Sequence, residues 1–219
     1  MASARRWLGS AAGSLLVGCA SPPVLVDADP ATGFALYRSG WLEQDEIAEL
    51  CAAGVEEIVV LDGTGREREC RWRESACPRL RVRWDRRQSA ERALDSAFLA
   101  AFDAWVEEAR AAGRGIAFRC RHGWHRTGRL AAYYAMRHQA RDAGTARREM
   151  HRRGRFMWRH PALDPQVEAL ADYLAGRPCG ESPAHCLAAA ESAGRPATFP
   201  EDVCPEPSGE GVPASGSWR

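Results

Sequence analysis

The residues best suited to chemistry lie in one short segment, Phe118 to Arg129, which reads Phe-Arg-Cys-Arg-His-Gly-Trp-His-Arg-Thr-Gly-Arg. A short apolar stretch typical of a strand precedes Cys120, and a run with helical spacing begins at Arg126. The backbone N–H groups at the start of a helix bind anions, and they also favour the thiolate form of a cysteine placed there. The segment therefore predicts an anion-binding loop that carries a cysteine nucleophile.

Several side chains of this loop have a clear role if the bound anion is a phosphate ester. The planar guanidinium of Arg126 can hold two phosphate oxygens at once. Gly123 permits a tight turn that directs the amides inward. Thr127 can hydrogen-bond the sulfur of Cys120 and ease its departure in a second chemical step. The positions expected to surround the phosphate are Arg121, His122, Gly123, Trp124 and His125.

The spacing Cys-x-x-Gly-x-x-Arg-Thr-Gly in residues 120–128 resembles the signature loop of the cysteine-based protein tyrosine and dual-specificity phosphatases. Two further stretches, Tyr37-Arg38-Ser39-Gly40 and Ala146 to Met150 followed by Gly154, are similar to segments of bacterial members of that family. The resemblance covers roughly residues 34–175. It implies a phosphomonoester hydrolase that forms a phosphocysteine and acts by default on phosphotyrosine or phosphoserine/threonine proteins.

Other functions remain open at this point. A phosphoinositide or inositol phosphate is a second substrate class, because the chain is rich in arginine and contains no lysine. A rhodanese-like sulfurtransferase also places a cysteine at an anion-binding loop, although its loop is typically one residue shorter. A non-catalytic phosphate-binding module is the third alternative, since Arg119 stands where the family usually has histidine and His125 where some relatives carry aspartate.

Phosphoester cleavage also needs a proton for the departing oxygen, and the family supplies it from an aspartate on a separate loop upstream. Asp85 lies 35 residues before Cys120, directly after a predicted strand, and is the expected general acid. Asp62 and His125 are weaker candidates, and Asp95 is expected within a helix. Further arginines could frame the pocket or form a solvated rim, namely Arg73, Arg79, Arg81, Arg83, Arg86 and Arg87.

The sequence gives no signal for a cofactor, a metal or a nucleic-acid partner. His122 and His125 lie near the thiol, but no second cysteine or carboxylate follows at zinc-finger spacing. The net charge of +1 gives no reason to expect nucleic acid. The expected partners are a phosphorylated protein or a small phosphorylated polyanion.

Hydrophobic patterning predicts an α/β domain over residues 34–176. Strands alternate with helices, which favours a central, largely parallel sheet with helices on both sides, and the family resemblance implies a dual-specificity phosphatase-like fold. The expected strands are 34–38, 55–61, 80–84 and 116–118. The expected helices are 42–53, 89–112, 126–138, 145–153 and 165–174.

The first residues are typical of an export signal. Arg5 and Arg6 precede a short run of apolar and small residues, and Leu16-Val17-Gly18-Cys19 resembles the lipobox of bacterial lipoproteins. The resemblance implies that residues 1–18 are a signal peptide and that Cys19 carries lipid. Residues 19–33 would then be a tether to the membrane of the bacterial cell envelope, on the periplasmic or outer-membrane face. An ordinary cleaved signal with an incidental cysteine is the alternative.

Export would change the chemistry of the other cysteines. Six remain besides Cys19 and Cys120, and in an oxidising compartment they could form disulfides. Proximity in the sequence makes Cys70–Cys77 and Cys179–Cys186 candidates, whereas Cys51 is expected to be a buried thiol on a helix. The remaining segment, 177–219, is rich in Pro, Gly, Ser and Glu and predicts a poorly ordered tail that a disulfide could pin.

Overall fold

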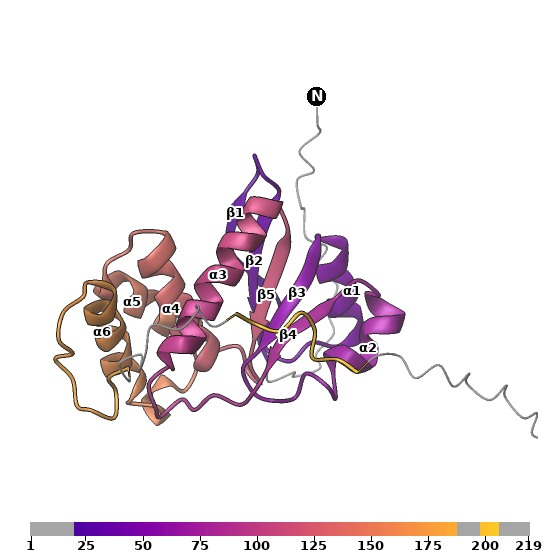
Figure 1. Ribbon diagram of the computed structural model, residues 1–219. Coiled ribbons are helices and arrows are strands. Elements are labelled where there is room, and N and C mark those ends of the chain that lie inside the picture. The colour runs from indigo at the N-terminus through magenta and orange to yellow at the C-terminus, as the bar shows by residue number, and fades with distance from the viewer. Residues whose placement is uncertain (1–19, 188–197, 206–219) are drawn as a thin grey trace, which may run out of the picture.

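A five-stranded sheet organises the residues that this computed structural model describes, 20–187 and 198–205 (Figure 1). In the sheet the strands follow the order β1-β2-β5-β3-β4. β1 runs antiparallel to β2, and the other neighbouring pairs are parallel, which confirms the predicted sheet. The strands are β1 (Val24–Asp29), β2 (Phe34–Ser39), β3 (Val55–Val60), β4 (Arg81–Asp85) and β5 (Gly115–Arg119).

Helices cover both faces of this sheet, as predicted. Alternate residues of β5 face opposite sides, so that Phe118 joins one hydrophobic core and Ala117 the other. Helices α3 and α4 line the first core, and α1 and α2 line the second (Figure 1). The helices are α1 (Gln44–Ala52), α2 (Glu69–Ala76), α3 (Ser96–Ala112), α4 (Arg126–His138), α5 (Ala143–Arg153) and α6 (Leu163–Leu174), with a 3₁₀ turn at Met157–Arg159.

The carboxyl ends of the four parallel strands meet at one edge of the sheet, where α/β proteins bind ligands. Asp62 follows β3 closely, and Cys120 follows β5 directly. The ladder continues beyond the strand ends, because the N–H of Leu61 donates to the carbonyl of Arg119 at 2.9 Å. This edge holds the Cys120 loop in place.

The segment expected to be a tether contains β1. Val24 pairs with Arg38 and Asp29 pairs with Phe34. Pro22, Pro23 and Pro30 lie on either side of the strand, where the ladder does not need the N–H that proline lacks. Residues 1–18 and the predicted lipidation site Cys19 lie outside the described residues. Among the helices described, none has the length and apolar character needed to cross a bilayer.

Two helical elements differ from the prediction. α3 begins at Ser96, not at residue 89, because the carboxylate of Asp95 caps its first turn by accepting from the N–H of Ala97 at 2.7 Å. Asp95 is therefore a cap and not part of the helix interior. α2 was not predicted, because its sequence is mostly polar and gives little helical periodicity.

The structure contains three disulfides among the described residues, Cys51–Cys77, Cys70–Cys204 and Cys179–Cys186. The last confirms a predicted pair. The predicted Cys70–Cys77 pair and the buried thiol at Cys51 were both wrong, because the fold brings α1, α2 and the segment 198–205 together. Phe199 of that segment packs 5.4 Å from Trp84 between ring centroids, so part of the predicted tail belongs to the core.

Candidate active site

The carbonyl oxygens of the loop that follows Cys120 are held from outside the loop. Four of them accept hydrogen bonds from neighbouring elements, so each peptide plane presents its carbonyl outward. Arg121 O accepts from Trp41 N (3.1 Å), His122 O from Ser21 N (3.0 Å), Gly123 O from Arg38 Nη2 (2.7 Å) and His125 O from Arg129 N (2.9 Å).

The backbone N–H groups of the same loop are left free. Within residues 20–187 and 198–205, the amides of residues 121–126 donate to no protein acceptor. They lie at the N-terminus of α4, whose dipole adds positive potential. A loop of outward carbonyls and free amides has the geometry that suits an oxyanion.

Gly123 is required for this geometry, as the sequence predicts. Its φ of +75° is unfavourable for other residues, and a Cβ there would lie 2.6 Å from the nitrogen of Gly40. Because glycine has no side chain, the loop can lie in close contact with Gly40, directly after β2.

Cys120 lies at the start of the loop with only 2% of its surface exposed. Its Sγ is 3.6 Å from Oγ1 of Thr127, the contact expected from the sequence. Cys120 is the one free cysteine among the described residues, since the other six are paired in disulfides. No described cysteine is therefore left to oxidise with it.

Two buried arginines near the sulfur were not identified from the sequence. Burial lowers the pKa of Arg38 to about 10 and that of Arg129 to about 9, and in each case negative charge on Cys120 opposes the shift. Neither guanidinium forms an ion pair with a described carboxylate. These unneutralised cations favour an anion in the loop. Arg38 belongs to the Tyr-Arg-Ser-Gly stretch, which was its only sequence signal.

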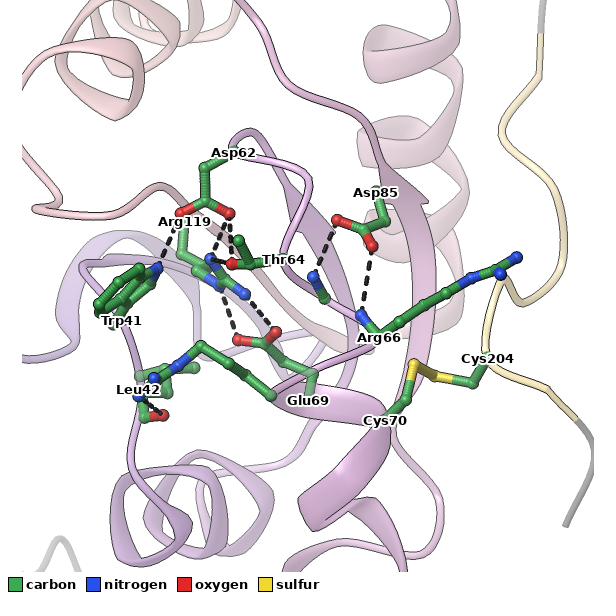
Figure 2. A network of polar contacts seen from close by, with 12 residues as sticks. Trp41, Leu42, Asp62, Thr64, Arg66, Glu69, Cys70, Asp85, Arg119 and Cys204 are labelled. Atoms are coloured by element: carbon green, nitrogen blue, oxygen red, sulfur yellow. Dashed lines mark hydrogen bonds and ion pairs between the residues drawn. A yellow bond between two sulfur atoms is a disulfide. The ribbon is translucent and has the colours of Figure 1, made fainter.

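Arg119, the residue before Cys120, does not offer an unpaired cation to the sulfur. Its side chain is fully buried, with Nε 2.6 Å from Oε1 of Glu69 and Nη1 2.5 Å from Oδ1 of Asp62 (Figure 2). Two carboxylates neutralise this guanidinium. Arg119 therefore ties β5 to α2 and to the turn after β3.

A cleft of about 960 Å³ opens beside the loop. Four of the five predicted phosphate-binding residues line it: Arg121, His122, Trp124 and His125. Five arginines that line the cleft form no ion pair among the described residues. The two carboxylates that line it, Asp62 and Glu91, already have partners. The cleft therefore favours anions. The arginines are Arg87, Arg92, Arg121, Arg126 and Arg159. Of the arginines in the segment from Arg71 to Arg92, which was expected to frame the pocket, Arg87 and Arg92 line the cleft.

The predicted phosphate clamp, Arg126, points toward the end of the sheet. Its Nη1 donates to the carbonyl of Leu61 at 3.0 Å, directly after β3. This contact holds the guanidinium at the mouth of the loop and leaves its other N–H groups available for an anion.

Asp85, the predicted general acid, makes structural contacts. Its carboxylate accepts from the N–H of Gly65 at 2.9 Å and from that of Arg66 at 3.2 Å, so it fastens the turn after β3 (Figure 2). Val60 pairs with both Asp85 and Arg119, so two strand spacings, about 9–10 Å, separate Asp85 from β5. Asp85 is absent from the residues that line the cleft.

The two weaker acid candidates lie at the cleft, but neither is well placed to donate a proton. Hydrogen bonds from Trp41, Thr64 and Arg119 occupy the carboxylate of Asp62. Burial lowers the pKa of His125 to about 4, so its ring is neutral at pH 7, and its Nε2 lies 2.8 Å from the carbonyl of Arg155.

Glu91 is the other carboxylate that lines the cleft, and the sequence analysis missed it. Its Oε1 lies 2.7 Å from Nδ1 of His160, which also lines the cleft. Arg129 holds the loop that carries Glu91 by donating to the carbonyl of Arg92 at 2.6 Å. No sequence signal could have joined Glu91 to His160, because they are 69 residues apart.

Comparisons with known proteins give matches among solved structures. No protein-family model matches the chain, and no curated protein matches it. It is similar to TpbA of P. aeruginosa (23% identity over 73% of this chain and 93% of that one, TM-score 0.46). It is also similar to a cysteine-to-serine variant of TpbA in complex with pTyr (25% identity, 60% and 79% covered, TM-score 0.46). Tk-PTP in the active form is a third match (16% identity, 67% and 96% covered, TM-score 0.49).

Proposed function

We propose that this protein is a cysteine-dependent phosphomonoester hydrolase. One observation carries the proposal: a row of free backbone amides at the N-terminus of α4 follows directly on a free, buried cysteine. Arg126 stands at the end of the same loop, and the cleft beside it is lined by unpaired arginines. This combination suits a dianionic phosphate ester better than a neutral substrate.

In the first step, Sγ of Cys120 attacks phosphorus as the bond from phosphorus to the ester oxygen breaks. The amides of residues 121–126 and the guanidinium of Arg126 hold the three equatorial oxygens, on which negative charge is spread. The products are a phosphocysteine and an alkoxide or phenoxide, which takes up one proton to become the alcohol.

We assign the proton transfer to Glu91, supported by His160. A protonated Glu91 carboxyl gives its proton to the departing oxygen, and the carboxylate then takes a proton from the water that attacks the phosphocysteine. As the second step breaks the S–P bond, the hydroxyl of Thr127 can donate to the sulfur, 3.6 Å away in the resting site. The cycle ends with inorganic phosphate and the original cysteine.

The proposed location is outside the cytosol. Three disulfides among the described residues suit an oxidising compartment, in agreement with the export signal suggested by the first residues. Lipid attachment at Cys19 remains part of this proposal and awaits mass spectrometry of the mature protein.

The experiment that tests the function is an assay of the purified protein with p-nitrophenyl phosphate, combined with acid trapping of radiolabelled phosphate on Cys120. We expect phosphate release and a labelled cysteine. Sulfur transfer from thiosulfate to cyanide without phosphate release would favour a sulfurtransferase. Binding of a phosphopeptide without any release would instead favour a non-catalytic module.

The assignment of Glu91 makes a prediction about leaving groups. Glu91→Gln is expected to slow hydrolysis of phenyl phosphate about 100-fold, because phenolate is a poor leaving group without a proton. Hydrolysis of p-nitrophenyl phosphate should fall much less, because nitrophenolate departs unprotonated. The ratio of kcat values for the two esters measures the effect.

Asp85→Asn is the matched control. It disturbs the turn at residues 65–66 and is expected to affect both esters alike. If the leaving-group dependence appeared in Asp85→Asn and not in Glu91→Gln, the assignment of the acid to Glu91 would be incorrect.

A further inference from the structure

A short loop between α5 and α6 exposes aromatic side chains beside the cleft. Phe156 is 54% exposed and Trp158 is 74% exposed, although they are only two residues apart. Met157 between them is buried in the core and fixes the loop. Aromatic rings presented to water in this way commonly mark a docking surface.

Arginines accompany both rings. The guanidinium of Arg159 lies 5.4 Å from the ring of Phe156 and 4.9 Å from that of Trp158. Arg155 lies over Trp124 at 5.6 Å. Neither Arg155 nor Arg159 has a carboxylate partner among the described residues. Exposed aromatic rings with unpaired cations suit the interface of an anionic bilayer, where the rings enter the headgroup layer and the cations meet lipid phosphates.

The loop conformation holds Phe156 at the cleft. Its φ of 55° lies in the left-handed region, which a phenylalanine adopts only at an energetic cost. Phe156 and Arg159 line the cleft, and the ring of Phe156 lies 6.0 Å from that of Trp124. The surface suited to a bilayer is therefore also one wall of the proposed active site.

The start of the described chain lies at the same place. Ser21 donates its N–H to the carbonyl of His122 at 3.0 Å, and its Oγ accepts from Nε1 of Trp124 at 2.6 Å. Ala20 and His122 line one small cavity. A lipid on Cys19, the residue before Ala20, would attach the protein at the mouth of the cleft. Ser21 and Phe156 of the aromatic loop both contact Trp124.

From this arrangement we infer that the protein docks on an anionic bilayer with the cleft facing the lipid and hydrolyses phosphomonoesters carried on lipid headgroups. The inference rests on the proposed function, whose substrate class it names. Docking in this orientation would place the cleft at the level of the lipid headgroups, where such phosphates lie. The unpaired arginines that line the cleft would meet this phosphate and its anionic neighbours.

The test uses the full chain with Cys19→Ser, so that no lipid anchor contributes. Vesicles of phosphatidylethanolamine and phosphatidylglycerol, with phosphatidic acid as the lipid phosphomonoester, serve as the probe. Adding Trp158→Ser is expected to lower vesicle binding and phosphatidic acid hydrolysis about tenfold, by loss of an interfacial aromatic residue. Turnover of p-nitrophenyl phosphate should be unchanged, because Trp158 does not line the cleft.

Tyr173→Ser is the matched control, because Tyr173 is 43% exposed on α6 and belongs to neither the loop nor the cleft. Equal effects of the two variants on vesicle binding would overturn the inference. So would faster turnover of a phosphotyrosyl peptide than of vesicle phosphatidic acid. If the unaltered chain showed no phosphatase activity, the proposed function would be rejected. Vesicle binding that depends on Trp158 would still support the docking surface in that case.

Discussion

Replacing Cys120 by serine is expected to abolish phosphate release while oxyanion binding persists. The drop in kcat should be on the order of 10⁴-fold or more, the size found when a catalytic nucleophile is removed. The amides of residues 121–126 and Arg126 stay in place, so inorganic phosphate should bind at least as tightly. Serine carries no negative charge that would repel the anion. Steady-state kinetics and titration calorimetry measure the two quantities.

The unfolding midpoint of Cys120→Ser checks that the variant is folded. Because the sulfur is buried and makes one polar contact, with Thr127, the midpoint should change little. Turnover within tenfold of the unaltered protein in a folded variant would rule out the phosphocysteine mechanism. If the variant lost both phosphate binding and turnover, the loop would not hold the oxyanion as proposed.

The second large effect is expected on stability. Glu69→Gln should lower the free energy of unfolding by about 3–5 kcal/mol, because it removes one charge of a fully buried ion pair. Arg119, which also has no exposed surface, would keep Asp62 as its one charged partner (Figure 2). Burial acts to lower the pKa of Arg119, but Glu69 and Asp62 outweigh it and raise the pKa, so the guanidinium is charged in the unaltered protein. Denaturant unfolding with the disulfides intact measures the change.

Two further variants show whether charge burial is the cause. Glu149→Gln removes a carboxylate that pairs with Arg152 and Arg153 on the surface, and should cost less than about 1 kcal/mol. The triple variant with Asp62→Asn, Glu69→Leu and Arg119→Met should be more stable than Glu69→Gln, because it removes all three charges of the buried network. A cost below 1 kcal/mol for Glu69→Gln would contradict this account.

Local features were predictable because their determinants are neighbours in the chain. The loop, its glycine and the helix that follows form one continuous segment, Cys120 to His138, so residue type and spacing specify the backbone. The apolar run from Ile58 to Leu61 also predicted a buried strand, which the structure has as β3. The start of α3 was predicted too early, because the polar stretch before Asp95 was taken as helix. The carboxylate of Asp95 caps the first turn, so the helix begins directly after this residue.

The surroundings of the cysteine were not predictable in the same way. Arg38 reaches the loop from 85 positions away, and Cys70 joins a cysteine 134 positions away. Proximity in the sequence favoured Cys77 for that pairing, but the sheet and helices decide which sulfurs meet. The predicted acid Asp85 fell after the expected strand, yet that strand lies two positions from β5 in the sheet.

The sequence by itself determined a strand, a glycine-containing loop and a helix, with a cysteine at the point where they meet. Tertiary structure decided which charges surround that cysteine: Arg119 is neutralised, Arg38 and Arg129 are not, and Glu91 lines the cleft in place of Asp85. The reason is physical. Backbone conformation depends on adjacent residues, whereas electrostatic and proton-transfer interactions depend on distances through space, which the packing of sheet and helices sets.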